Sequence, residues 1–280
     1  MFNPDSLIRV RLYSFRDEDL DEELLIQRLT AAHRRRQQKL PQEQDFRLVF
    51  GESDFLPGLV IDKYGDHFAV QVYAAGFDRR IEMVVSALCR LFPVKAIYEK
   101  DDIKLREPEG LERRERLLYG QPDPDLIISE NGVRFYVDIA GGQKTGYFFD
   151  HRLTRRKVRR LARNRRVLDV FCYTGSFAIN AALGGATEVI AVDISSEACR
   201  WAERNARLNG VEGRCRFVTA DAFEYLQELL ACGERFDLVN LDPPAFIKSQ
   251  KQKPSGIKGY EKINRLALAL LKPGGILVSS

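Results

Sequence analysis

From Arg166 onward, apolar segments of strand length alternate with amphipathic segments of helix length. Because a parallel pair of strands needs a crossover connection, this alternation predicts a parallel sheet with helices on both faces. We therefore expect an α/β, Rossmann-like domain with a doubly wound sheet. The expected strands are 167–171, 188–192, 214–218, 236–241 and 276–279. One expected helix begins at 174, and the other three span 195–208, 222–230 and 260–271.

The first half of the chain has a different pattern, with short strands between turns rich in glycine, proline and aspartate. Such spacing predicts antiparallel hairpins, and the Asn131-Gly132 pair predicts a tight hairpin turn. Asp21 is placed to cap a helix that runs to Lys39. We expect a small α+β domain here, and a separate strand from Leu7 to Leu12. The other expected elements are strands 46–50, 59–64, 68–73, 95–100, 127–129 and 133–139, and a helix over 77–92.

The composition, 45% hydrophobic and 30% charged over 280 residues, is that of a globular protein. The five cysteines form no CxxC pair, so neither a zinc site nor a disulfide framework is expected, and free thiols suit the cytoplasm. No apolar run reaches the length of a membrane span, and the N-terminus lacks the apolar region of a signal peptide. We expect a cytoplasmic protein with no metal and no membrane contact.

Residues 167–175 form an apolar strand, a tight turn and the start of a helix. Open α/β sheets bind ligands at the carboxyl ends of their strands, so Asp169, Phe171, Tyr173 and Gly175 are candidates for a cofactor site. A single glycine offers less close backbone approach than a dinucleotide pyrophosphate needs, which argues against an NAD-dependent oxidoreductase. An ordinary connection between strand and helix is about equally compatible with this segment alone.

The next two strands also end in acidic residues. Asp193, with Ile194 beside it, is placed to accept both ribose hydroxyls of an adenosine. Asp221, with Ala222, is placed to accept the adenine amino group. Each aspartate has a structural alternative, because either could simply cap the helix that follows it.

The fourth strand leads into Asp242-Pro243-Pro244-Ala245-Phe246, the most specific segment of the chain. The two prolines remove backbone donors and stiffen the loop. Such a loop can hold a flat base through its carbonyl groups and a stacked ring, so Pro243, Pro244 and Phe246 are candidate contacts to a substrate base. Asp242 is the candidate catalytic residue and a further cofactor contact.

Together these strand ends resemble class I S-adenosylmethionine-dependent methyltransferases. The upstream segment GQKTGYFFDHR and the segments GESDFLPGLVIDKYGD and GYEKINRLALALLKPGGILVSS resemble the cytosine-5 methyltransferases of large-subunit (23S) ribosomal RNA. The resemblance implies S-adenosylmethionine as cofactor. It also implies that residues of the upstream segment help to enclose this cofactor, namely Lys144, Thr145, Tyr147, Phe149 and Asp150. The same segment is not a P-loop, since the required upstream glycine is missing.

The family pattern further implies a PUA remnant at 1–15, a central α+β domain at 16–140 and a methyltransferase domain at 141–280. By this pattern the chain is expected to be truncated at both ends, with an incomplete sheet. The nucleophilic cysteine is expected beyond Ser280, because none of the five present suits that role. We accordingly expect no methyl transfer to C5 from these 280 residues alone, and transfer from an extended chain. Formation of a homodimer is left open.

Nine arginine and lysine residues and no acid lie between Arg152 and Arg166. Next to a base pocket, such a stripe is suited to an RNA backbone, although runs of charge are more often a solvated helix face. We expect ribosomal RNA as partner. Two alternatives stay open: a methyltransferase acting on a base nitrogen, and a non-catalytic RNA-binding module. The candidate phosphate contacts are Arg152, Arg155, Arg156 and Arg159.

Overall fold

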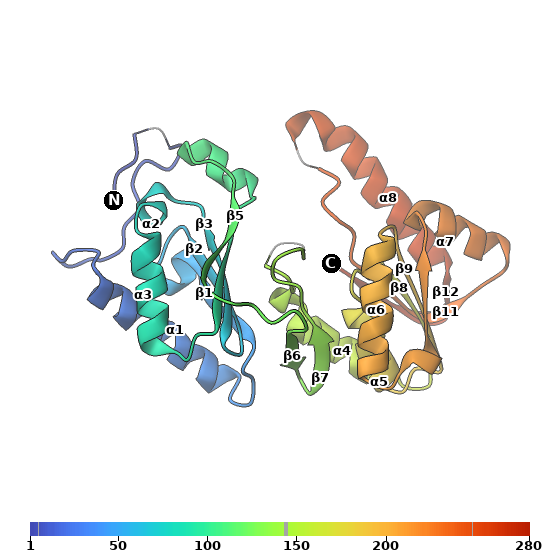
Figure 1. The fold of residues 1–280 in the computed structure, drawn as a ribbon. Helices are drawn as coiled ribbons and strands as arrows, with labels where there is room; N and C mark the ends of the chain where they lie inside the picture. The colour runs from blue at the N-terminus through green and yellow to red at the C-terminus, as the bar shows by residue number, and fades with distance from the viewer. Residues whose placement is uncertain (5, 143–144, 248) are drawn as a thin grey trace. The chain divides into compact units, whose positions relative to one another are not determined.

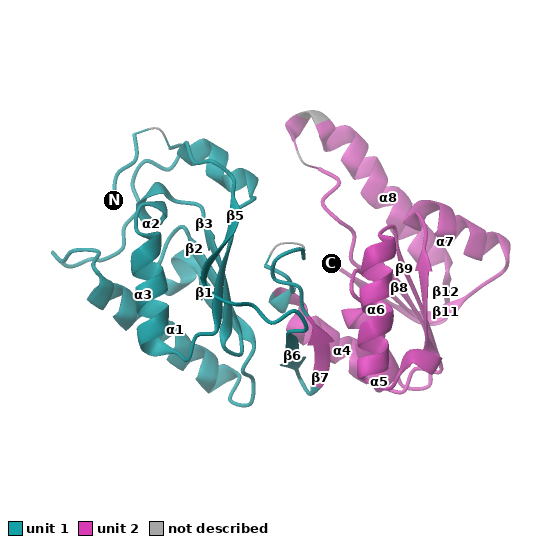
Figure 2. Cartoon of the chain, in the orientation of Figure 1, with its two compact units in different colours: residues 1–132, 137–149 teal, residues 133–136, 150–280 magenta. Residues whose placement is uncertain are grey.

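The computed structural model describes residues 1–4, 6–142, 145–247 and 249–280. The chain divides into two compact units, and each has its own five-stranded sheet (Figure 2). Unit 1 comprises Met1–Gly132 and Val137–Phe149, and unit 2 comprises Val133–Tyr136 and Asp150–Ser280.

Unit 1 is built on the sheet β1-β2-β3-β4-β5, and α1 packs on both α3 and β1 (Figure 1). Asp21 caps α1 as expected, since its carboxylate accepts the Leu24 amide at 2.8 Å. The apolar face of α1, with Leu25 and Leu29, is fully buried in the core of this unit. The elements are α1 (Glu22–Lys39), β1 (Phe46–Phe50), β2 (Leu59–Tyr64), β3 (His67–Val72), α2 (Ala75–Asp78), α3 (Ile81–Leu91), β4 (Ala96–Lys100) and β5 (Glu115–Gly120), with 3-10 turns at Gly51–Asp54 and Lys104–Glu109.

The structure of unit 1 differs from the expectations in three ways. β1, β2 and β3 are antiparallel neighbours, but β3 and β4 are parallel, because α3 carries the chain across between them. The expected helix over 77–92 is split into α2 and α3. β5, which the sequence did not reveal, pairs antiparallel with β4 at the edge of the sheet.

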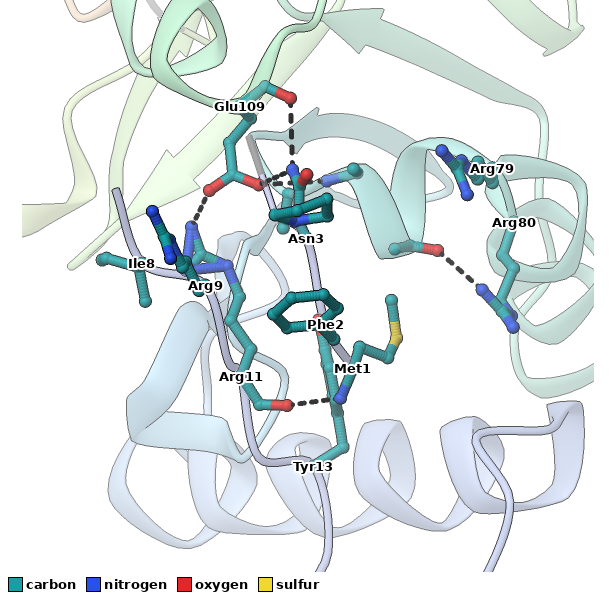
Figure 3. Close-up of a pocket in the computed structure, with 14 residues that line it drawn as sticks. Met1, Phe2, Asn3, Ile8, Arg9, Arg11, Tyr13, Arg79, Arg80 and Glu109 are labelled. Carbon is teal, nitrogen blue, oxygen red and sulfur yellow. Dashed lines mark hydrogen bonds and ion pairs between the residues drawn. The ribbon is translucent and has the colours of Figure 1, made fainter. Parts of the chain in front are cut away.

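The N-terminal segment does not form the strand expected at Leu7–Leu12. Its one described bridge joins Phe2 to Val10, and Leu7, Ile8 and Val10 are exposed. Polar contacts hold this segment instead: Asn3 Nδ2 and Arg11 Nη2 donate to the Glu109 carboxylate at 3.1 and 2.5 Å (Figure 3). The alternation of apolar and basic residues therefore does not mark a strand here.

A hairpin links the two units. β6 (Ile127–Glu130) and β7 (Val133–Tyr136) form a two-stranded sheet around the expected Asn-Gly turn. Asn131 and Gly132 both have positive φ, at 52° and 75°, which is the geometry of a type I′ turn.

Unit 2 contains the predicted alternation of strands and helices. β11 has the predicted bounds, whereas α8 begins seven residues before the predicted start at Tyr260. The elements are α4 (Arg152–Leu161), β8 (Arg166–Val170), α5 (Ser176–Leu183), β9 (Glu188–Asp193), α6 (Ser196–Leu208), β10 (Cys215–Thr219), α7 (Ala222–Ala231), β11 (Phe236–Leu241), α8 (Lys253–Ala269) and β12 (Leu271–Ser279), with 3-10 turns at Phe149–His151, Glu212–Arg214 and Gln250–Gln252.

The sheet of unit 2 has the order β10-β9-β8-β11-β12, and every neighbouring pair is parallel. This confirms the doubly wound α/β prediction. α4 packs on α5, which also contacts α6, whereas α7 packs on α8. With right-handed crossovers, α5 and α6 cover one face of the sheet, α4 lies beside α5, and α7 and α8 cover the other face. The strand order reverses between β8 and β11, so the ligand crevice of such a sheet belongs there.

Among the residues described, we find no helix whose length and apolar content would let it cross a bilayer.

Candidate functional site

The candidate site of unit 2 lies where β8 and β11 end side by side. The Asp242 amide donates to the Val170 carbonyl at 3.3 Å, so the turn after β8 and the loop after β11 start from the same point. Both belong to the switch point of the sheet, where the two neighbouring crossovers leave in opposite directions. The predicted cofactor turn and the predicted base loop are therefore adjacent.

The turn after β8 has a strained backbone. Phe171 and Tyr173 have positive φ, at 65° and 48°, which is unfavourable for side chains of this size. Gly175 has φ 81°, and a Cβ there would lie 2.9 Å from the Ala202 Cβ and 3.0 Å from the Phe217 ring. Strain of this kind persists only where surrounding contacts enforce it, and it collects at ligand sites.

Asp193, at the end of β9, holds this turn in place. Its Oδ2 accepts the Tyr173 amide at 2.8 Å, and its Oδ1 accepts the Ser195 amide at 2.9 Å. The Asp193 side chain thus connects the first two strand ends. The next residue, Ile194, is 72% exposed, an unusual position for a large apolar side chain in a well-packed unit.

Asp169 lies beneath the turn and is fully buried. Its Oδ1 accepts the Asn240 amide group at 2.7 Å, and its Oδ2 accepts the Ala178 amide at 3.0 Å. Burial outweighs these hydrogen bonds and raises the pKa of Asp169 to about 7. A carboxyl group in this position costs stability when it ionises.

This shift predicts a pH dependence of folding. The pKa in the unfolded chain is about 3.9, so between about pH 4 and pH 7 the folded state retains a proton that the unfolded state loses. The free energy of unfolding should therefore fall as pH rises through this window, by up to roughly 4 kcal/mol from Asp169. In Asp169→Asn, whose side chain stays neutral, this contribution should vanish.

Urea unfolding at pH 5 and pH 7.5 measures the effect. Asn240 can accommodate the substitution, because its Oδ1 is buried without a hydrogen-bond partner among the residues described. A flipped Asn240 amide would accept a hydrogen bond from the NH₂ group that the substitution introduces. The informative quantity is the stability of the wild type relative to the variant. If that difference does not change between the two pH values, Asp169 does not carry the proton.

Asp221 has the structural role that the sequence left open. Its Oδ1 caps α7 by accepting the amides of Phe223 and Glu224 at 2.8 and 3.1 Å. Ala222 is buried under the first turn of that helix. Capping uses one carboxylate oxygen, so a contact from Oδ2 to an adenine amino group is compatible with this arrangement and stays a prediction.

The Asp-Pro-Pro loop after β11 is anchored by α8. The Tyr260 hydroxyl accepts the Phe246 amide at 3.1 Å and donates to the Pro244 carbonyl at 3.4 Å. The Phe246 ring lies 4.7 Å from the Tyr260 ring and 5.9 Å from the Phe223 ring. Pro244, Phe246 and Phe223 line a shallow pocket. An aromatic pocket at the mouth of the sheet is suited to a flat base.

His151 is a candidate that the sequence did not single out. Its Nε2 lies 3.5 Å from Asp242 Oδ2, and its ring packs edge-on against Phe177 at 5.7 Å. Lone histidines are common, and this one is far from Asp242 in the chain, so only the fold brings the two together.

The predicted cofactor segment 144–149 lies in unit 1, apart from Lys144, which is outside the described residues. Thr145, Tyr147 and Phe149 are buried there. Thr145 Oγ1 donates to Asp62 at 2.5 Å, and Phe149 stacks on Tyr64 at 5.3 Å. Asp150 is exposed and begins the longer part of unit 2. The structure shows the packing of Thr145, Tyr147 and Phe149 within unit 1, and the contact of any of these residues or of Asp150 with a cofactor stays a prediction.

The basic stripe forms α4, and its burial corrects part of the RNA prediction. Arg152 and Arg155 are 6% and 1% exposed, and the Arg155 guanidinium lies over the Phe177 ring. Helical periodicity turns these two side chains toward the protein, so they are not on a surface that phosphates could reach. Arg156 is exposed and Arg159 is half-buried, and the other exposed cations of the stripe are Lys157, Arg160 and Arg163.

One group of three carboxylates among the described residues is close enough to hold a metal ion: Asp78, Glu99 and Asp101 in unit 1. Arginine side chains already neutralise it. Arg106 pairs with Asp78 and Asp101 at 2.7 and 2.6 Å, and Arg114 pairs with Glu99 at 2.8 Å. The three carboxylates are therefore part of an ion-pair network with Arg106 and Arg114.

A family model described as S-adenosylmethionine-dependent methyltransferase matches residues 110–280. The matched range includes every strand of the unit 2 sheet, from β8 to β12. The chain belongs to this methyltransferase family. Its cofactor is accordingly S-adenosylmethionine, as the family resemblance implied.

The chain is also similar to curated proteins over nearly its whole length. It is 43% identical to the ribosomal RNA large subunit methyltransferase I of Tolumonas auensis, over 99% of this chain and 72% of that protein. It is 40% identical to the protein of the same name from Klebsiella pneumoniae, over 99% of this chain and 71% of that protein.

Two solved structures share the fold. A candidate SAM-dependent methyltransferase from Streptococcus mutans aligns with a TM-score of 0.82 at 26% identity, over 96% of this chain and 69% of that one. A second methyltransferase structure, complexed with SAH, aligns with a TM-score of 0.83 at 26% identity, over 96% of this chain and 70% of that one. The Rossmann-like methyltransferase fold is thereby confirmed.

Proposed function

We propose that this protein transfers a methyl group from S-adenosylmethionine to C5 of a cytosine in large-subunit ribosomal RNA. The observation that carries the proposal is the Asp-Pro-Pro loop at the switch point, with Asp242 beside the cofactor turn and Phe246 in an aromatic pocket. The RNA substrate is supported by the names of the relatives in Tolumonas and Klebsiella.

The donor set of unit 2 fits an adenosine-containing cofactor. Asp193 offers carboxylate oxygens at the end of β9, where ribose hydroxyls are bound in sheets of this type. Ile194 offers exposed apolar surface for the adenine ring, and Asp221 offers an acceptor at the next strand end. In this proposal the backbone of 171–175 surrounds the rest of the cofactor, whose sulfonium supplies the methyl group.

The proposed chemistry at the base needs a thiolate, because C5 of cytosine is a poor nucleophile. A sulfur–C6 bond would form as N3 gains a proton, and the electron pair released from the C5–C6 double bond would then form the C5–methyl bond while the methyl–sulfur bond of the cofactor breaks. A base would then remove the C5 proton, the sulfur–C6 bond would break to release the thiolate, and N3 would give up its proton, which restores the ring. Asp242 would hydrogen-bond the cytosine edge and favour protonation at N3.

All five cysteines are among the described residues, and none is presented to the Asp-Pro-Pro loop. Cys172 and Cys199 are 4% and 5% exposed, and burial raises the pKa of Cys215 to about 12. Cys89 is in unit 1, and Cys232 follows α7 before the start of β11, whereas the Asp-Pro-Pro loop follows the end of β11. The proposal therefore keeps the nucleophile on chain following Ser280, whose amide donates to the Leu241 carbonyl next to Asp242 at 3.1 Å.

The same distribution of cysteines favours one competing proposal, transfer to a base nitrogen, for which no thiol is needed. Methylated-nucleoside analysis of large-subunit ribosomal RNA treated with enzyme and S-adenosylmethionine distinguishes the two. A chain extended by the expected cysteine should form 5-methylcytosine, and the 280 residues alone should not. A nitrogen-methylated base from either chain would support the competitor, and 5-methylcytosine from the 280 residues would make Cys172 the first alternative nucleophile.

The exposed face of α4 predicts a contact with the RNA backbone. The double variant Arg156→Glu/Arg160→Glu should bind RNA more weakly, and the slope of log K against log salt should fall by about one for each lost phosphate contact. Filter binding at several salt concentrations measures this.

Arg235→Glu is the matched control, because Arg235 is also exposed in unit 2 but lies outside α4, directly before β11. Its RNA affinity and salt dependence should resemble the wild type. If the control and the α4 variant have the same RNA affinity and the same salt dependence, the exposed face of α4 is solvated and does not contact RNA.

A further inference from the structure

A second group of cations lies on unit 2, on α6 and β7, and the proposed function does not use it. We call it the α6 surface. Arg134, Arg200 and Arg207 are exposed, and a shallow hollow opens between β7 and α6. The α6 surface consists of Arg134, Tyr136, Arg200, Trp201, Arg204 and Arg207.

Side-chain amides of α6 and its C-cap fix β7 in place. Tyr136 N donates to Asn205 Oδ1 at 2.8 Å, and Arg134 N donates to Asn209 Oδ1 at 3.0 Å. Asn209 Nδ2 in turn donates to the Arg134 carbonyl at 2.7 Å. The two asparagines thus satisfy the edge of β7 as a neighbouring strand would. The α6 surface is therefore preformed, and its cations and rings keep fixed spacings.

The centre of the α6 surface is a stack of a cation and two rings. The Arg204 guanidinium lies 3.7 Å from the centre of the Tyr136 ring and 5.2 Å from that of Trp201. Tyr136 and Trp201 are 6.4 Å apart, and both are partly exposed. Indole rings and guanidinium planes are the platforms on which unpaired RNA bases stack.

The surrounding charge favours a polyanion. Among the described residues that line the hollow, Glu203 is the one acid, and it lies 3.6 Å from Arg207 with both side chains more than half exposed, so that pair is weak. Arg134, Arg200 and Arg204 add further positive charge to the α6 surface. α5 contacts both α4 and α6, so these three helices belong to one layer of unit 2.

We propose that the α6 surface binds single-stranded RNA that flanks the target base, with phosphates on Arg200 and Arg207 and a base against Trp201. This inference rests on the proposed function and extends it, because it assigns a second RNA contact beyond α4. Single-stranded RNA is favoured over a protein partner because rings and arginines alternate on one preformed surface.

Trp201 is the single tryptophan of the chain and therefore reports directly on this surface. Titration of the protein with large-subunit ribosomal RNA should quench its fluorescence. Arg200→Glu/Arg207→Glu should lower RNA affinity about tenfold or more at low salt and reduce the salt slope by about two. Trp201→Phe should bind RNA more weakly with the salt slope unchanged, since it weakens stacking and removes no charge.

Arg235→Glu again serves as control, and calorimetry with S-adenosylmethionine checks that each variant is folded. If the wild type binds RNA but the α6 variants bind like the control, the α6 surface is overturned while the proposed function stands. If an acidic polypeptide competes as well as RNA for Trp201 quenching, the surface is a protein-binding one. If the wild type binds no ribosomal RNA, the proposed function itself fails.

Discussion

Asp242→Asn is expected to reduce methyl transfer to RNA by about 100-fold or more, the scale on which positioned proton-transfer groups act. The substitution keeps the shape of the side chain but removes the charge that would stabilise a proton on the cytosine ring. It also weakens the contact with His151 Nε2, 3.5 Å away. Single-turnover transfer with labelled S-adenosylmethionine, measured on the chain that carries the expected cysteine, gives the rate.

Asp237→Asn is the matched control, because Asp237 lies on the same strand at its other end and binds Arg166 N and Lys272 Nζ instead. That variant should transfer methyl groups at close to the wild-type rate. Cofactor affinity of Asp242→Asn should fall much less than its rate. A transfer rate within a few-fold of the wild type would remove Asp242 from the catalytic role.

Asp193→Ala should weaken S-adenosylmethionine binding by about 1.5–3 kcal/mol, the range for hydrogen bonds to a charged group. This corresponds to roughly a 10- to 150-fold change in Kd. Two causes act together: the ribose loses its acceptors, and the Tyr173 amide loses the partner that holds the cofactor turn. Isothermal titration calorimetry measures the change.

Ser195→Ala is the control that distinguishes loss of the Asp193 carboxylate from a general disturbance of the start of α6. Ser195 caps α6 through the Ala198 amide, so its loss should cost about 1 kcal/mol of stability but leave cofactor affinity nearly unchanged. Wild-type affinity in a folded Asp193→Ala protein would refute the ribose assignment. If Asp193→Ala lowers stability as Ser195→Ala does and leaves cofactor affinity nearly unchanged, the role of Asp193 is purely structural.

The strands were predictable where apolar runs are bounded by turn residues. Phe46–Phe50, Leu59–Tyr64 and Phe236–Leu241 have the predicted bounds. β5 was missed because it is an edge strand with mostly exposed side chains, so no burial pattern marks it. The pairing of β3 with β4 could not be read from strand spacing alone, because α2 and α3 between them reverse the expected direction.

The start of α8 was missed for a tertiary reason. Gly256 and Gly259 lower helix propensity, so the sequence favoured a loop before Tyr260. In the fold, a Cβ at Gly256 would lie 2.4 Å from the Ile247 side chain, and one at Gly259 would lie 3.3 Å from the Phe246 ring. The glycines let the Asp-Pro-Pro loop pack against the helix.

The acidic residues of the site were predictable because the carboxyl ends of parallel strands share an edge. That rule indicated Asp193, Asp221 and Asp242, and the structure puts each at such an end. It could not say which face of α4 is buried, so Arg152 and Arg155 were misassigned. His151 required the three-dimensional structure, because nothing in its local sequence relates it to Asp242.

The Tyr260 hydroxyl should protect the Phe246 amide of the partly exposed Asp-Pro-Pro loop from hydrogen exchange. Because the Phe246 amide is bonded to a helix side chain rather than to water, it can exchange its hydrogen for deuterium only when that contact opens. Its protection should therefore follow the opening of α8 around Tyr260. The segment proposed to contact the base would then behave as part of a cooperative unit with the helix that follows it, so the loop would be ordered before any substrate arrives.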